Sequence, residues 1–154
     1  WVSRRLRTVG MPDEGEILQD FINPLLSQIR IDTSPQISRL AEDRLGLRGP
    51  VTSVRRLART MNLTRARVYQ LLDEINDVMT VRWPTGRHQV YELRDKFAAE
   101  SECLDDPPNL EQFHAAIELF YPGSRRGADG PLEKAVRPKG RDGKPASIVV
   151  ARSV

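Results

Sequence analysis

Apolar residues recur at helical spacing through most of the chain, beginning just after Asp13. The first stripe has gaps that alternate between one and three residues, which places its side chains on one face of a helix. Its members are Ile17, Leu18, Phe21, Ile22, Leu25, Leu26 and Ile29. Pro24 lacks a backbone N–H and should kink or split this helix near Asn23. The oligomeric state does not follow from the sequence; if the chain forms a homodimer, this stripe could serve as the interface.

A second helix is expected to begin at Ser34 and Pro35. A serine side chain accepts a hydrogen bond from the backbone at a helix start, and proline fits the first helical position. The inward face should consist of Ile37, Leu40, Ala41 and Leu45. Gly46 should end this helix, because glycine readily adopts the left-handed backbone conformation.

Two short amphipathic segments follow, separated by Asn62, a residue that tolerates the left-handed conformation of a tight turn. Thr52 is expected to cap the first segment, whose inward residues are Val54, Leu57, Ala58 and Met61. Thr64 is expected to cap the second, whose inward residues are Val68, Leu71, Leu72 and Ile75. This order of elements is typical of a helix-turn-helix, which we place at residues 52–76.

Residues 78–93 allow two interpretations. Helical spacing returns at Val90, Leu93, Phe97 and Ala98. The alternative is a β-hairpin wing with strands over residues 79–83 and 88–93. Beyond this segment, Asn109 and Gln112 have the spacing of a capping box, for a helix whose inward residues are Leu110, Phe113, Ile117 and Phe120.

These patterns predict an all-α fold. We expect a helical domain over residues 13–121, with a multi-helix core around the helix-turn-helix. Residues 1–12 are basic and should form an irregular N-terminal arm. Residues 122–154 are basic and contain many Gly and Pro residues, which is typical of a flexible tail.

The net charge of +3 is unevenly distributed along the chain. Residues 44–97 carry ten Arg and one Lys against five acids, whereas residues 98–121 carry six acids and no Lys or Arg. Residues 52–72 contain five arginines and no acid. Such a cationic field attracts polyanions, although a basic helix face is often only solvated. The acidic segment could likewise be a solvated face, or it could cover the basic one or dock on a partner.

The inward positions of the second helix determine which residues face outward. If its aliphatic residues are buried, the opposite face carries Arg65, Tyr69 and Gln70, with Arg67 at the margin. Arginine matches a guanine edge and glutamine an adenine edge in the major groove. The helix start at Thr64 favours a phosphate. Further DNA-backbone contacts are expected from the first helix and, if the wing forms, from residues beyond it; these candidates are Arg55, Arg56, Arg59, Arg82 and Arg87.

The same stretch resembles the helix-turn-helix in region four of bacterial sigma factors. The resemblance covers residues 37–76 and is strongest over TSVRRLARTMNLTRARVYQL, at Thr52, Leu57, Ala58, Met61, Leu63, Thr64, Arg65, Arg67, Val68, Gln70 and Leu71. It implies a DNA-binding protein in transcription control, with RNA polymerase as a further partner. The chain departs from the family at Ala66 and Tyr69, where Glu and Arg are frequent, and its first helix carries arginines in place of acids.

Enzymatic chemistry has no recognisable motif in this sequence. We find no Gly-rich phosphate loop and no nucleophile motif, and a single Cys103 with the distant His88 and His114 gives no metal-ligand spacing. We therefore expect a DNA-binding protein that is not an enzyme, without cofactor or metal, in the cytoplasm and associated with the nucleoid. No apolar run is long enough for a membrane span. The alternative is a helical protein-interaction module within a larger complex.

Overall fold

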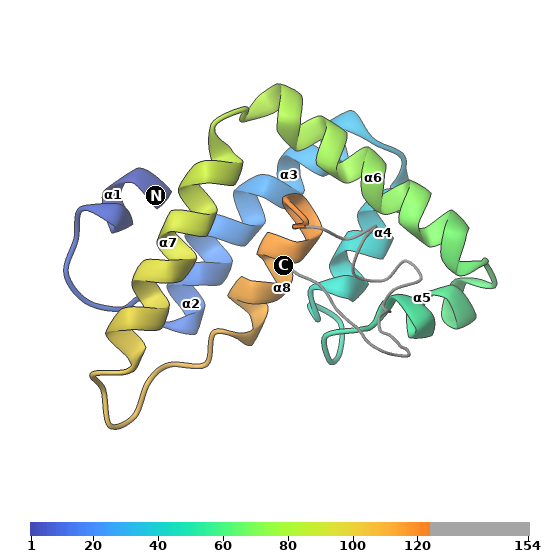
Figure 1. Cartoon of the computed structure of the whole chain (residues 1–154). Coiled ribbons are helices and arrows are strands. Elements are labelled where there is room, and N and C mark those ends of the chain that lie inside the picture. The colour runs from blue at the N-terminus through green and yellow to red at the C-terminus, as the bar shows by residue number, and fades with distance from the viewer. Residues whose placement is uncertain (124–154) are drawn as a thin grey trace, which may run out of the picture. The chain divides into compact units, whose positions relative to one another are not determined.

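The computed structural model describes residues 1–123 of the 154-residue chain, and Trp1–Tyr121 form one compact unit. The described residues fold into helices and contain no β-strand, which confirms the predicted all-α class (Figure 1). The helices are α1 (Val2–Leu6), α2 (Glu14–Glu16), a π-helical segment (Ile17–Ile22), α3 (Asn23–Asp32), α4 (Pro35–Arg44), α5 (Val54–Met61), α6 (Arg65–Arg82), α7 (Gly86–Ser101) and α8 (Glu111–Phe120).

The first long helical stretch changes its hydrogen-bonding pattern where Pro24 was expected to disturb it. Asp13 caps α2 by accepting a hydrogen bond from the backbone N–H of Glu16. A π-helical segment then runs up to Ile22, and α3 starts with Pro24 in its first turn. A proline ring collides with the carbonyl four residues earlier in a regular α-helix. The wider π turn before Pro24 gives that carbonyl more room, so the chain continues without a loop.

Helix α4 begins and ends at the residues that the sequence predicts. Ser34 caps its start, with Oγ accepting a hydrogen bond from the Ile37 N–H. At the other end, Leu47 N–H donates to the Glu42 carbonyl at 3.1 Å and Gly46 N–H to the Asp43 carbonyl at 3.2 Å. Together with the φ of 74° at Gly46, these bonds form a Schellman motif, which satisfies the last carbonyls of the helix.

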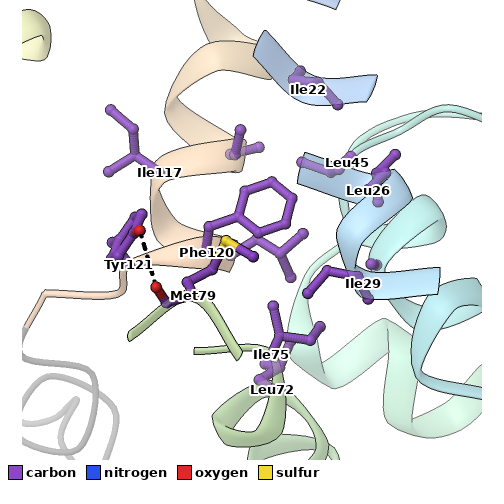
Figure 2. Close-up of a cluster of buried hydrophobic side chains, with 14 of the residues drawn as sticks. Ile22, Leu26, Ile29, Leu45, Leu72, Ile75, Met79, Ile117, Phe120 and Tyr121 are labelled. Carbon is purple, nitrogen blue, oxygen red and sulfur yellow. Dashed lines mark hydrogen bonds between the residues drawn. The ribbon is translucent and has the colours of Figure 1, made fainter. Parts of the chain in front are cut away.

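The core is built from aliphatic and aromatic side chains of the π-helical segment, α3, α4, α6, α7 and α8, with further residues from α1 and α5. Figure 2 shows Phe120 of α8 surrounded by Leu26 and Ile29 of α3, Leu45 and Ile75. The stripe that we considered as a dimer surface lies in this core, because Ile17, Phe21, Ile22, Leu26 and Ile29 are all buried. That use of the stripe was therefore a wrong prediction: the helix faces its own domain.

The N-terminal arm is more ordered than predicted. Val2–Leu6 form the helix α1, which packs against α7. Trp1 stacks on Phe21 with ring centroids 5.4 Å apart, and Lys96 of α7 donates to the Thr8 carbonyl at 2.7 Å. Val2 supplies the apolar contact with the core. The many basic residues of this segment gave no indication that Val2–Leu6 would form a helix with one buried side.

Residues 78–93 adopt the helical alternative, and the β-hairpin wing was a wrong prediction. Helix α6 continues to Arg82 because Met79 is buried in the core, and α7 starts at Gly86. Only Trp83, Pro84 and Thr85 separate the two helices. Tyr121 fastens this corner, since its hydroxyl donates to the Trp83 carbonyl at 2.7 Å.

Helix α8 confirms the predicted apolar face but not the capping box. Asn109 Oδ1 accepts from Glu111 N–H at 2.9 Å, while Gln112 donates to the Leu45 carbonyl at 3.1 Å. Gln112 therefore connects α8 to the end of α4 and does not bond back to Asn109. Of the predicted basic tail, residues 124–154 lie outside the described part of the chain.

Candidate functional site

The candidate site is the hairpin of α5 and α6, and its turn is held by two backbone hydrogen bonds. Leu63 N–H donates to the Ala58 carbonyl at 2.8 Å and Asn62 N–H to the Arg59 carbonyl at 3.2 Å. Asn62 has φ 57° and ψ 47°, the left-handed conformation expected from its side chain. Leu63 packs against the core just after the turn. These contacts fix the direction in which α6 leaves α5.

The first turns of α6 place their aliphatic and polar residues on opposite sides, as predicted. Thr64 caps the helix by accepting from Arg67 N–H at 3.0 Å. Val68 is 0% exposed and Leu71 is 1% exposed. Arg65, Arg67 and the following Gln70 are exposed. Nothing in residues 1–123 covers this polar face.

Tyr69 does not lie fully on the exposed face. Its ring is half-buried and packs against the core, so it sits at the boundary between the two sides of α6. The prediction placed Tyr69 outward with Gln70, but successive residues of a helix differ by about 100° in direction. Tyr69 is therefore positioned by packing.

Two of the outward side chains contact each other. Arg67 Nη1 donates to Gln70 Oε1 at 3.1 Å, between residues one helical turn apart. The contact leaves the amide N–H groups of Gln70 and the remaining guanidinium N–H groups directed to solvent. Arg67 and Gln70 are thus held together by this hydrogen bond, next to Arg65, and both present N–H donors to solvent.

Helix α5 adds three exposed arginines to the same region. Arg55, Arg56 and Arg59 are exposed, whereas Leu57 and Ala58 are buried. Its cap is Ser53, whose Oγ accepts from Arg56 N–H at 3.2 Å, and not Thr52 as predicted. The Thr52 hydroxyl instead donates to the Pro50 carbonyl, which shifts the helix start by one residue.

Arg82 and Arg87 do not join this cluster. Arg82 is at the far end of α6, about 25 Å along the helix axis from Arg65, and makes a two-pronged contact with Asp32 at 2.8 and 3.0 Å. Hydrogen bonds from Arg82 and then from Gln28 hold the pKa of Asp32 below its usual value. Arg87 lies over the rings of Tyr91 and Tyr121. Their assignment to the site depended on the wing, which does not form.

The acidic segment does not cover the hairpin. Helix α8 reaches α6 further along, where Asn76 donates to the Phe120 carbonyl at 3.0 Å. Arg65 and Arg67 remain exposed at the start of α6. Masking of the arginines by residues 98–121 was therefore a wrong alternative.

Two arginines that the sequence did not single out lie next to α5. Arg39 of α4 and Arg48 of the following loop line a hollow that also includes Arg56. The helix end at Gly46 was predicted, but its consequence, that the chain reverses there and returns toward α5, was not. Spacing alone does not bring residues 39, 48 and 56 together.

Within residues 1–123, no group of three or more His, Cys, Asp or Glu side chains could hold a metal ion. No helix of this part is long and apolar enough to cross a membrane. Comparison with known proteins adds no relative: no family model matches the chain, and neither a curated protein nor a solved structure matches it.

Proposed function

We propose that the protein binds double-stranded DNA through α5 and α6 and acts in transcription control. The observation that carries this proposal is the exposed face of α6, which presents Arg65, Arg67 and Gln70 while Val68 and Leu71 anchor the helix. Residues at the start of a recognition helix are those that meet base edges in the major groove.

Under this proposal the two helices have different roles. On α6, Arg65 would bind a guanine edge through both guanidinium prongs, and the paired Arg67 and Gln70 would bind a neighbouring base or phosphate. On α5, Arg55 and Arg59 would contact the phosphate backbone, as the first helix of a helix-turn-helix does. Contacts to phosphates set the register, and contacts to bases set the sequence preference.

The resemblance of residues 37–76 to region four of bacterial sigma factors supports a role in transcription. Under this proposal the tight turn at Asn62 and the capped start of α6 serve to hold Arg65 against the DNA. RNA polymerase is the protein partner that the resemblance implies.

A salt-titrated mobility shift with mixed duplex DNA tests the proposal. We expect the logarithm of the affinity to fall linearly with the logarithm of the salt concentration, with a slope of about −0.9 for each phosphate neutralised. Substituting both Arg65→Ala and Arg67→Ala should weaken binding by about 100-fold while the circular-dichroism melt stays in place, because both side chains are exposed.

Arg4→Ala with Arg7→Ala is the matched control, since it removes the same charge from exposed positions in and just after α1. Figure 1 shows α1 at the opposite end of the helical unit from α5. Equal losses from the two pairs would indicate unspecific charge attraction. An affinity unaffected by Arg65 and Arg67 would refute the proposal and favour the protein-interaction module.

A further inference from the structure

A hollow of about 360 Å³ lies between α4, the loop after it and α5. Its size falls within the range of small-ligand pockets. The charged side chains of its lining are Arg39, Arg48, Arg56 and Asp43, and Thr52 and Thr60 add hydroxyl groups. Three guanidinium groups against one carboxylate make this lining cationic.

The guanidinium groups are available to a ligand. Arg39 and Arg56 are exposed, and neither side chain makes a hydrogen bond or ion pair within the described part of the chain. Arg48 Nη1 is 3.6 Å from Glu42 Oε1, whereas Arg30 contacts the other oxygen of that carboxylate at 2.9 Å. Because Arg30 already neutralises Glu42, Arg48 can turn to a ligand at little cost.

The wall of the hollow is held in shape by the chain itself. Arg44 Nη1 donates to the Thr52 carbonyl at 2.8 Å, which ties the end of α4 to the segment before α5. Gly46 has a positive φ, and a Cβ there would lie 2.9 Å from the Val51 nitrogen. The backbone of the loop is therefore closely packed, so the path of the chain around the hollow is set before a ligand binds.

We propose that this hollow binds a phosphate group. A guanidinium offers two parallel N–H donors that match two phosphate oxygens, and three such groups surround the space here. Asp43 leaves an excess of two positive charges in the lining, which suits the single charge of a phosphodiester or the charges of a phosphate ester.

Two sources would present this chemistry: the backbone of bound DNA, or the phosphate of a small molecule. Arg56 favours the backbone, because it belongs both to the hollow and to the arginine face of α5. In that case the hollow holds one phosphate of the DNA strand that α5 contacts. This source rests on the proposed function, whereas the small-molecule source does not.

The test uses the full chain and a pair of substitutions that leaves the hairpin intact, Arg39→Gln with Arg48→Gln. The matched control is Arg4→Gln with Arg7→Gln, which removes the same charge near α1. One arm measures affinity for a mixed duplex across a salt series. The other arm titrates inorganic pyrophosphate and follows the amide resonances of Gly49 and Thr52 by NMR.

A backbone phosphate predicts a loss of duplex affinity of about tenfold or more beyond the control and a salt slope smaller by about one. A small-molecule phosphate predicts unchanged duplex affinity, with saturable pyrophosphate shifts that disappear in the Arg39 and Arg48 variant. Unchanged results in both arms would overturn the inference. The Arg65 and Arg67 variant separates the two proposals. If it binds duplex DNA as tightly as wild type, the proposed function fails, and the pyrophosphate titration alone then tests the hollow.

Discussion

Gly86 shows how one residue determines where a helix can begin. A Cβ at this position would lie 2.5 Å from Trp83 Cδ2 and would also collide with the Tyr121 hydroxyl. Trp83 and Tyr121 pack edge to face, with ring centroids 5.8 Å apart, directly over this glycine. The corner between α6 and α7 therefore requires a residue without a side chain.

We predict that Gly86→Ala lowers the free energy of unfolding by about 1–3 kcal/mol, the usual cost of overpacking a filled site. Gly49→Ala is the control, since a Cβ there meets nothing within 4 Å. Urea unfolding of the two variants makes the comparison. Equal effects would mean that the corner relaxes around the added methyl group.

At the scale of elements, charged side chains of α7 hold the segment that follows α1. Glu100 accepts hydrogen bonds from Lys96 at 2.9 Å and from Gly10 N–H at 3.4 Å. These contacts, with Lys96 the largest cause, lower the pKa of Glu100. The ionised form of this carboxyl is therefore more stable in the folded than in the unfolded chain.

A group whose pKa is lowered by folding stabilises the protein above its unfolded pKa, and this contribution is lost as the pH falls through the folded pKa. We thus expect Glu100→Gln to reduce stability more at pH 7 than at pH 3. Chemical unfolding of wild type and variant at both pH values measures the difference. Glu102→Gln, on the exposed neighbouring carboxylate, should change stability little at either pH, and a constant deficit of the Glu100 variant would contradict the argument.

The elements that could be predicted are those with local signals. Ser34 and Thr64 cap helices, and Gly46 and Asn62 end them, through contacts within a few residues. The end of α6 was ambiguous, because its last turns are stabilised by the burial of Met79 in the core and no glycine marks the helix end.

The candidate site likewise contains residues that the sequence could predict and residues that it could not. The exposure of Arg65 and Gln70 follows from helical periodicity once Val68 is known to be buried. The contributions of Arg39 and Arg48 depend on the path of the loop between α4 and α5, and such a tertiary approach leaves no periodic trace.

At the scale of the whole molecule, α6 belongs to two regions. Its first turns carry the exposed polar face, and its last turns are buried against α3 and α8 or paired through Arg82 and Asp32. A DNA site confined to the hairpin, as proposed, would therefore use only the N-terminal part of this 18-residue helix. The remainder anchors that part to the core.

Arg82→Ala tests where the interface ends. Because Arg82 is about 25 Å from Arg65 along the helix and is paired with Asp32, we expect duplex affinity within about twofold of wild type, against about 100-fold for the Arg65 and Arg67 pair. Fluorescence anisotropy with a labelled duplex at fixed salt measures both variants. A large loss from Arg82→Ala would mean that DNA lies along the whole of α6, a geometry in which the first turns would no longer enter the groove alone.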